Sequence, residues 1–326
     1  MPLLEIRDLQ IEFGRGPDAV RAVDGVSFSI EPGETLCLVG ESGSGKSVTA
    51  LSIARLLATP PAHYAGGSIR LDGREVLAMS NAELRGIRGG LVSYVFQEPG
   101  ASLNPVFRVG WQIKETLRLH RPEAATDAEV IRLLKLVGIA APERRIRSYP
   151  HELSGGMQQR VMIAMAIAAS PRLLVADEPT TALDVTIQAQ IIELLQDLKR
   201  QLNMSILLIT HNLGIVGDIA DCLAVMYAGQ IVETGPAAEI LAKPLHPYTR
   251  ALMDSVPALG GGAARLRAIP GSVPQLSALP AGCRFHPRCP MVQPPCTTQP
   301  VSLAPVTAGR EVRCPYYNLT PDPTRS

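Results

Sequence analysis

Short, almost wholly apolar segments recur along the chain, and each ends on polar or small residues. The four clearest are Thr35–Val39, Leu91–Phe96, Arg172–Ala176 and Ser205–Thr210. Apolar runs of roughly four to eight residues are typical of strands that are buried on both faces of a parallel sheet. Stretches with apolar residues at helical spacing stand between these runs. The pattern therefore predicts an α/β fold with parallel strands.

The helical spacing predicts helices over Ser47–Leu57, from Ser154 to about Ala169, and over about Thr186–Leu202. Residues 105–150 are also helical in pattern, with expected helices at Trp111–His120 and Asp127–Val137. Thr126 is a suitable start and Gly138 a suitable stop for the second of these. This region predicts a small helical subdomain inserted in the main fold.

Near the N-terminus, apolar and polar residues alternate instead. Two alternating runs within residues 3–31, divided by a Gly-Arg-Gly-Pro turn, predict antiparallel strands. Another strand pair is expected at residues 67–71 and 75–77, because Asp72-Gly73 between them is a strong hairpin signal. Phe13 lies on the first alternating run, near the N-terminus. It is either an aromatic side chain that stacks on adenine or a core residue.

The pattern G-x-x-x-x-G-K-S occupies residues 40–47, between a predicted strand and a predicted helix. This is the context that a phosphate-binding loop requires, because glycines turn successive backbone N–H groups toward an anion and the helix start adds partial positive charge. The lysine supplies a full charge for the terminal phosphates and the last serine a hydroxyl for Mg²⁺. The expected nucleotide contacts are Gly40, Ser42, Gly43, Ser44, Gly45, Lys46, Ser47 and Val48.

Polar side chains come directly after other predicted strands. Gln97 follows one strand, Asp177-Glu178 a second and His211 a third. Ligands of open α/β sheets bind at the carboxyl ends of the strands. Two acids that leave an apolar strand together are costly to bury without a cation, so a metal-bound nucleotide is their natural partner.

A second phosphate-seeking surface is predicted at Ser154-Gly155-Gly156. Ser154 is a good N-cap for the helix that follows, and the two glycines expose backbone N–H groups at its start. A capped helix alone would not explain two adjacent glycines in a first turn, where they weaken helix formation.

The charged residues nearly cancel: 31 Lys and Arg stand against 30 Asp and Glu, a formal charge of +1 over 326 residues. The chain is therefore not expected to bind nucleic acid or an anionic membrane through an overall field. No apolar run approaches the roughly 18 residues that cross a bilayer; the longest is Val161–Ala169. The start lacks the basic and apolar regions of a secretory signal. We expect a protein that stays where ATP, Mg²⁺ and reductants are.

Taken in order, these motifs resemble those of the ATP-binding subunit of ABC transporters, over about residues 3–255. The matching elements are the phosphate loop, Gln97, Leu-Ser-Gly-Gly-Met-Gln-Gln-Arg at 153–160, Leu-Leu-Val-Ala-Asp-Glu-Pro at 173–179, Ala-Leu-Asp at 182–184 and His211. The Leu-Ser-Gly-Gly element separates this family from other P-loop ATPases. The one departure is Met157-Gln158, where many members have a single Gln after the glycines.

The resemblance implies a P-loop NTPase (RecA-like) core with an antiparallel β subdomain, an inserted helical subdomain over about residues 100–168 and an irregular C-terminal extension over 256–326. It implies that Ser47, Gln97 and Asp177 surround Mg²⁺. Glu178 would be the general base and His211 would contact the γ-phosphate, so the expected catalytic residues are Glu178, His211, Gln97 and Lys46.

The resemblance also implies partners. Ser154, Gly155 and Gly156 would close on ATP held by a second cassette, identical or homologous, with Asp184 at the dimer seam. Two transmembrane permease subunits and, indirectly, an extracytoplasmic solute-binding protein would complete an importer, with this chain peripheral at the cytoplasmic face of the membrane and no nucleic acid bound. The run Leu-His-Pro-Tyr-Thr-Arg-Ala-Leu at 245–252 resembles the dipeptide and oligopeptide importers and their nickel-import relatives.

Cysteines form two groups. Cys37 and Cys222 lie in apolar surroundings and are expected to be inert core residues. The other four are spaced C-x5-C-x6-C-x17-C in a tail, rich in Gly, Pro and Ala, that begins at about Val256, and they are Cys283, Cys289, Cys296 and Cys314. In a reducing compartment, four thiolates suit zinc or a [4Fe–4S] cluster better than disulfides. Zinc ribbons favour tight C-x2-C pairs, and residues 282–290 resemble the tail of cluster-bearing peptide-importer cassettes, so the cluster is favoured; zinc and unliganded thiols remain alternatives.

Other function classes predict other features. DNA-repair ABC ATPases carry long coiled coils between Gln97 and Ser154, where this chain has a small insertion, and translation ABC ATPases join two cassettes in one chain. An exporter would ordinarily need a membrane domain. A redox or metal sensor built around the cysteines is a further alternative, as is an importer of nickel or another solute. The leading hypothesis is an ATPase that powers import of dipeptides or oligopeptides.

Overall fold

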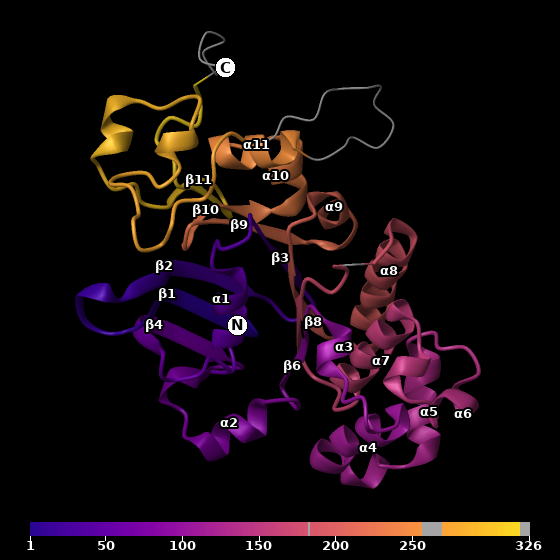
Figure 1. Cartoon of the computed structure of the whole chain (residues 1–326). Coiled ribbons are helices and arrows are strands. Elements are labelled where there is room, and N and C mark those ends of the chain that lie inside the picture. The colour runs from indigo at the N-terminus through magenta and orange to yellow at the C-terminus, as the bar shows by residue number, and fades with distance from the viewer. Residues whose placement is uncertain (182, 256–268, 320–326) are drawn as a thin grey trace. The chain divides into compact units, whose positions relative to one another are not determined.

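A computed structural model describes residues 1–181, 183–255 and 269–319 (Figure 1). Ala182 of the Ala-Leu-Asp element and the predicted start of the extension at Val256 lie outside the described residues. The chain forms two compact units. The first contains Met1–Ile30, Thr35–Leu77 and the described residues from Thr210 onward, and the second contains Glu31–Glu34 and Ala78–Ile209.

An antiparallel sheet in the first unit has the strand order β2-β1-β4-β5. Its strands are β1 (Leu4–Phe13), β2 (Val20–Ile30), β4 (Ala62–Leu71) and β5 (Arg74–Glu75). Ile6 is opposite both Phe28 and Ile69, so the apolar positions of the alternating runs share one buried face. The predicted antiparallel strands are thus confirmed. The predicted strand at 75–77 is shorter, because Val76–Ala78 forms a 3₁₀ turn.

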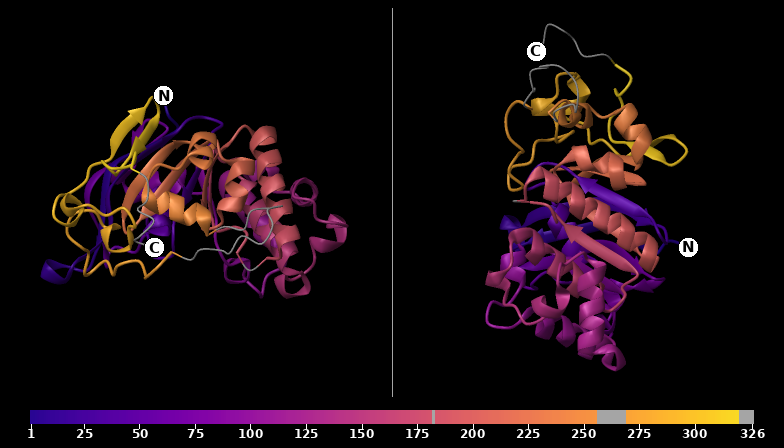
Figure 2. Two further views of the ribbon diagram at one scale, coloured as in Figure 1. Left: turned by 90° about the horizontal axis from the view of Figure 1, so that it is seen from above. Right: turned by 90° about the vertical axis from the view of Figure 1, so that its right-hand side faces the viewer.

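A second set of strands in the first unit has the order β3-β9-β10-β12-β11. They are β3 (Thr35–Val39), β9 (Cys222–Tyr227), β10 (Gln230–Pro236), β12 (Arg310–Val312) and β11 (Ala304–Thr307). β3 and β9 are parallel, and the remaining pairs are antiparallel. The C-terminal segment, yellow in Figures 1 and 2, thereby adds two strands to this sheet and lies beside α11 (Pro247–Asp254).

The other helices of the first unit are short. They are α1 (Lys46–Ser52), α9 (Val216–Ile219) and α10 (Ala237–Ala242). The helix predicted over Ser47–Leu57 therefore ends five residues early. Arg55 has a positive φ of 49°, a left-handed conformation that does not continue a helix.

Three parallel strands in the order β6-β7-β8, at Val92–Val95, Leu173–Asp177 and Ser205–Thr210, belong to the second unit, apart from Thr210, the last residue of β8. Its helices are α2 (Asn81–Ile87), α3 (Pro99–Ser102), α4 (Val109–His120), α5 (Asp127–Leu136), α6 (Pro142–Arg145), α7 (Gly155–Ile167) and α8 (Val185–Leu202). The Thr126 side chain accepts from the Glu129 N–H and begins α5, as its sequence position predicts.

The expected fold class is confirmed: an α/β core, an antiparallel sheet, an inserted group of helices and an irregular C-terminal segment. Among the described helices, none combines the length and the apolar character that a membrane span requires.

Candidate nucleotide-binding site

The phosphate loop, residues 40–47, lies in the first unit between β3 and α1 and needs glycine at two positions for space. A Cβ on residue 40 would lie 2.1 Å from the Met226 carbonyl oxygen, and one on residue 45 would lie 2.6 Å from the Ala22 carbonyl oxygen. Gly43 has open space around it, but its φ of 77° favours glycine. The loop conformation is therefore fixed by its neighbours before any ligand binds.

Lys46 is 5% exposed, and its side chain folds back into the loop. Its Nζ donates to the carbonyl oxygens of Gly40 at 2.8 Å and Glu41 at 2.9 Å. Ser44 is buried, Ser42 and Ser47 are exposed, and Val48 is half-buried. A lysine folded into a loop that carries two exposed serines is suited to bind phosphate oxygens.

In the second unit, the structure brings Gln97 and Glu178 together. Gln97 Nε2 donates to Glu178 Oε2 at 3.1 Å, and Thr181 Oγ1 donates to the same oxygen at 2.8 Å. Glu178 follows β7 with a positive φ of 48°, and its N–H donates to the Ile209 carbonyl at 2.9 Å. A non-glycine residue in this conformation is uncommon and is typical of functional sites. Asp177, half-buried, ends the strand one residue earlier.

Ser154, Gly155, Gly156 and Asp184 lie on one concave surface of the second unit, which Met157, Arg160, Leu183 and Ile187 also line. Ser154 Oγ accepts from the Met157 N–H at 3.4 Å and caps α7, as predicted. Asp184 Oδ1 accepts from the Ile187 N–H at 2.9 Å and caps α8. Asp184 therefore also has a local structural role that its sequence context did not reveal.

The structure gives the positions of two other predicted site residues, Phe13 and His211. Phe13 is the half-buried last residue of β1, next to a hollow lined by Glu12, Gly14 and residues 59–63. His211 is exposed directly after β8. Their adenine and γ-phosphate roles stay predictions.

The four tail cysteines line one small cavity in the first unit, together with His246, Phe285, His286 and Met291 among others. The Cys283 N–H donates to the Cys296 carbonyl at 2.9 Å. Burial raises the pKa of three of these thiols. It raises the pKa of Cys289 to about 12 and that of Cys314 to about 11, and it also raises the pKa of Cys283. Within the described ranges, no three His, Cys, Asp or Glu side chains are grouped closely enough to hold one metal ion.

Of the remaining cysteines, Cys37 is buried as predicted, whereas Cys222 is only half-buried.

Two family models match the chain: ABC transporter at residues 23–181, and oligopeptide/dipeptide transporter, C-terminal region, at residues 232–296. The oligopeptide transport ATP-binding protein AppD of Bacillus subtilis is 49% identical over 97% of this chain and 97% of its own length. This chain belongs to the ATP-binding subunits of ABC transporters, in the oligopeptide and dipeptide branch.

Solved structures of ABC cassettes share its fold. A dimeric ATP-binding cassette in a post-hydrolysis state with ADP and phosphate is 26% identical, with a TM-score of 0.62, and the match covers 72% of this chain and 98% of that one. CbiO1 of Clostridium perfringens, part of the transporter complex cbiONQ, is 27% identical with a TM-score of 0.64, covering 74% and 91%.

In this ABC cassette, two residues that the sequence did not mark for this role, Tyr248 and Arg288, contact the phosphate loop through Glu41. Glu41 occupies a variable position of the loop motif, yet Tyr248 and Arg288 bind it. The available signal was the unusual Leu-His-Pro-Tyr and His-Pro-Arg-Cys runs, which helped to place the chain in its branch but were given no contact.

Proposed function

We propose that this protein is the ATP-hydrolysing subunit of a membrane importer for dipeptides or oligopeptides. The observation that carries the ATPase part is Glu178, an acid held by Gln97 and Thr181 in a strained conformation at the end of a buried strand. The peptide part rests on the oligopeptide transport name of AppD, which aligns over nearly the whole chain.

Each site residue has a chemical role in this proposal. The phosphate loop binds the triphosphate, with Gly43, Gly45 and Lys46 as its main contacts and Phe13 stacked on adenine. Ser47, Gln97 and Asp177 offer the hydroxyl, amide and carboxylate oxygens that Mg²⁺ prefers, and the ion would neutralise phosphate charge. Glu178 orients the attacking water and accepts its proton, while His211 contacts the γ-phosphate.

The concave surface around Ser154 is proposed to meet ATP on a second cassette, with Asp184 at the seam. A surface that exposes the first turn of α7 is suited to an anion, and a relative of 26% identity was solved as a dimer with ADP and phosphate. Hydrolysis would then require association of two cassettes, identical or homologous.

The proposed membrane partners are two permease subunits, with a solute-binding protein on the far side and this chain at the cytoplasmic face. The support is an exposed aromatic group in the second unit. Phe107 and Trp111 stack with ring centroids 4.2 Å apart, and they are 39% and 38% exposed. Exposed aromatic residues in a cluster are typical of protein interfaces.

We also propose that Cys283, Cys289, Cys296 and Cys314 bind a [4Fe–4S] cluster, with zinc as the alternative. The donor chemistry fits, because all four thiols line one cavity, and each thiol of a cluster binds a different iron, so the four need not converge on a single ion. Raised pKa values mean that metal binding would release protons. Anaerobically purified protein should be brown with absorbance near 400 nm; a colourless, zinc-loaded protein would exclude the cluster.

The test of the proposed function is co-purification of the intact complex, followed by reconstitution in vesicles. We expect permease chains, ATP-dependent peptide uptake and loss of uptake in Lys46→Ala. Uptake of nickel without peptide uptake would favour the nickel-import alternative. A purified protein that hydrolyses ATP at full rate without any membrane partner would favour a non-transport ABC ATPase.

A further inference from the structure

An ion pair between Arg288 and Glu41 joins the C-terminal segment (residues 269–319) to the phosphate loop. Arg288 Nη1 donates to Glu41 Oε2 at 2.7 Å and Arg288 Nη2 donates to Glu41 Oε1 at 3.0 Å. Arg288 lies between Cys283 and Cys289, in a 3₁₀ turn over His286–Arg288. The two charged residues are 247 positions apart in the sequence but belong to the same compact unit. Two parallel hydrogen bonds to one carboxylate form the strongest geometry that an arginine adopts.

This ion pair is largely removed from solvent. The Arg288 side chain is 5% exposed and that of Glu41 is 28% exposed. Arg288 Nε also donates to the Pro270 carbonyl at 2.8 Å, and its guanidinium carbon lies 5.8 Å from the ring centre of Tyr227. Arg288 is therefore held by several partners and cannot follow Glu41 freely if the loop moves.

The main chain of Glu41 is held as well. Its N–H donates to the Tyr248 hydroxyl at 2.9 Å, and its carbonyl accepts from Lys46 Nζ at 2.9 Å. Tyr248 and Phe285 are fully buried against Tyr227, with ring centroids 4.6 to 5.4 Å apart. The first variable residue of the loop is thus fixed at its N–H, its carbonyl and its carboxylate.

The charges explain why such an arrangement matters. Glu41 puts a carboxylate in the loop that is proposed to bind a triphosphate, and an uncompensated carboxylate there would repel the ligand. Arg288 supplies the opposite charge at hydrogen-bonding distance. Its removal would leave a partly buried, unpaired acid beside the anion site.

We infer that Arg288 is a positioning residue that neutralises and orients Glu41. Through Arg288, the C-terminal segment sets the affinity of the phosphate loop for nucleotide. The inference rests on the proposed nucleotide site. It assigns the C-terminal segment a direct effect on ATP binding, in addition to any metal that it holds.

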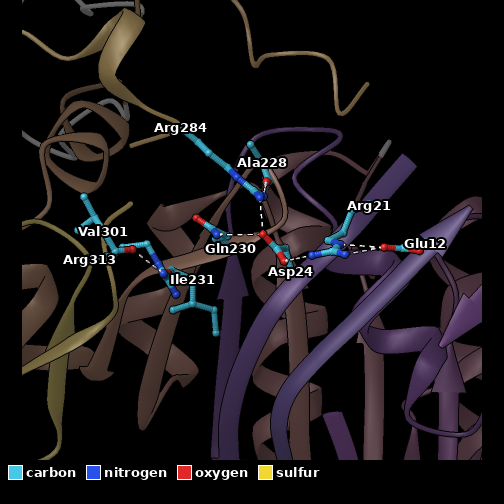
Figure 3. A network of polar contacts seen from close by, with 9 residues as sticks. All are labelled: Glu12, Arg21, Asp24, Ala228, Gln230, Ile231, Arg284, Val301 and Arg313. Atoms are coloured by element: carbon cyan, nitrogen blue, oxygen red, sulfur yellow. Dashed lines mark hydrogen bonds and ion pairs between the residues drawn. The ribbon is translucent and has the colours of Figure 1, made fainter. Parts of the chain in front are cut away.

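A matched control lies four residues away. Arg284 also joins the C-terminal segment to the rest of the first unit, but its partners, the Asp24 carboxylate and the Ala228 carbonyl, are outside the phosphate loop (Figure 3). Asp24 is shared with Arg21 at 3.1 Å and Gln230 at 3.2 Å, so Arg284→Gln leaves it with other partners.

The experiment measures equilibrium binding of a fluorescent ATP analogue to the full-length chain with Mg²⁺. Arg288→Gln should weaken binding about fivefold to twentyfold, whereas Arg284→Gln should change it less than about twofold. Glu41→Gln should not weaken binding, because Gln keeps one acceptor for Arg288 and removes the repelling charge. The double variant Glu41→Gln with Arg288→Gln should bind better than Arg288→Gln alone, and Arg288→Lys should lie between Arg288→Gln and the parent.

Several results would overturn the inference: unchanged affinity in folded Arg288→Gln, an equal loss in Arg284→Gln, or weaker binding in Glu41→Gln. If Arg288→Gln does not fold, nucleotide binding by Glu41→Gln still tests the inference, because weaker binding in that variant would contradict it. In the assembled transporter, Arg288→Gln should raise KM for ATP and leave kcat within about twofold. Normal binding by Lys46→Ala would instead contradict the proposed nucleotide site.

Discussion

Gln97 donates a hydrogen bond to Glu178 at 3.1 Å, across 81 residues of sequence. The amide and the acid follow β6 and β7, neighbouring parallel strands of the second unit. Glu178 is held in addition by Thr181 at 2.8 Å. The acid that is proposed to activate water therefore has its orientation fixed in the ligand-free protein, and Gln97 and Glu178 are expected to act together.

Replacing Glu178 with Gln should retain ATP binding and lower turnover at least about a hundredfold, because the amide cannot accept the proton of the attacking water. The measurement is steady-state ATPase activity of the complex together with nucleotide affinity. Thr181→Val, which removes one hydrogen bond to the acid and keeps the acid itself, should cost much less. Near-normal hydrolysis by Glu178→Gln would remove Glu178 from the role of base.

Alanine should be tolerated very differently at two glycines of the phosphate loop. At Gly45 the added Cβ lies 2.6 Å from a backbone oxygen, in a residue with φ of 102°, whereas at Gly43 there is open space. Gly45→Ala should therefore destabilise the fold by about 2 kcal/mol or more, and Gly43→Ala by about 1 kcal/mol. Urea denaturation of the two variants measures the difference. Equal destabilisation would show that the loop rearranges around the Cβ.

The two proposed roles of Asp184 can be separated. Its carboxylate caps α8, so Asp184→Ala should cost about 1 kcal/mol of stability, while Asp184→Asn should cost little because Asn is an equally good cap. If the charge acts at the dimer seam, Asp184→Asn should still weaken ATP-dependent dimerisation, measured by size-exclusion chromatography in a Glu178→Gln background. A dimer as stable as that of the parent would limit Asp184 to the capping role.

A buried ion pair attaches β12 to the rest of the first unit. Arg310 Nη2 donates to Glu233 Oε1 at 2.7 Å, with side chains 7% and 0% exposed, and the carboxylate also accepts from the N–H groups of Leu245 and His246. Glu233→Gln leaves Arg310 buried without a counter-charge and should destabilise the protein by about 3 kcal/mol or more. Adding Arg310→Met should recover part of that loss in thermal unfolding. A double variant less stable than Glu233→Gln would contradict this account.

Acid should weaken the fold through His246. Burial, followed by the charges of Arg313 and Arg250, lowers the pKa of this histidine to about 3 from 6.5. The folded protein keeps it neutral while the unfolded chain protonates it below pH 6.5, so its contribution is complete above that pH and is lost as the pH falls toward 3. His246→Gln, which keeps an acceptor for the Tyr248 N–H, should show a flatter decline in stability between pH 6.5 and 4. An identical pH profile would exclude His246 as a cause.

Much of the fold could be predicted because its signals are local. The apolar runs of β3, β6, β7 and β8, the alternation of β1 and β2 and the caps at Thr126 and Ser154 each depend on a few neighbouring residues. Element boundaries depend on more than local residue type: α1 ends at Ser52 because of the left-handed backbone conformation at Arg55, which an arginine does not by itself favour.

The motifs of an ABC cassette and their order can be read from the residues alone, because each motif carries its chemistry within a few neighbouring positions. Which distant side chains meet becomes visible only in the folded chain: Gln97 with Glu178, Arg310 with Glu233, and Arg288 with Glu41. Such pairs form where chain topology places two polar groups together away from water, and the free energy that joins them depends on burial and distance. Neither quantity is present in a local pattern of residues.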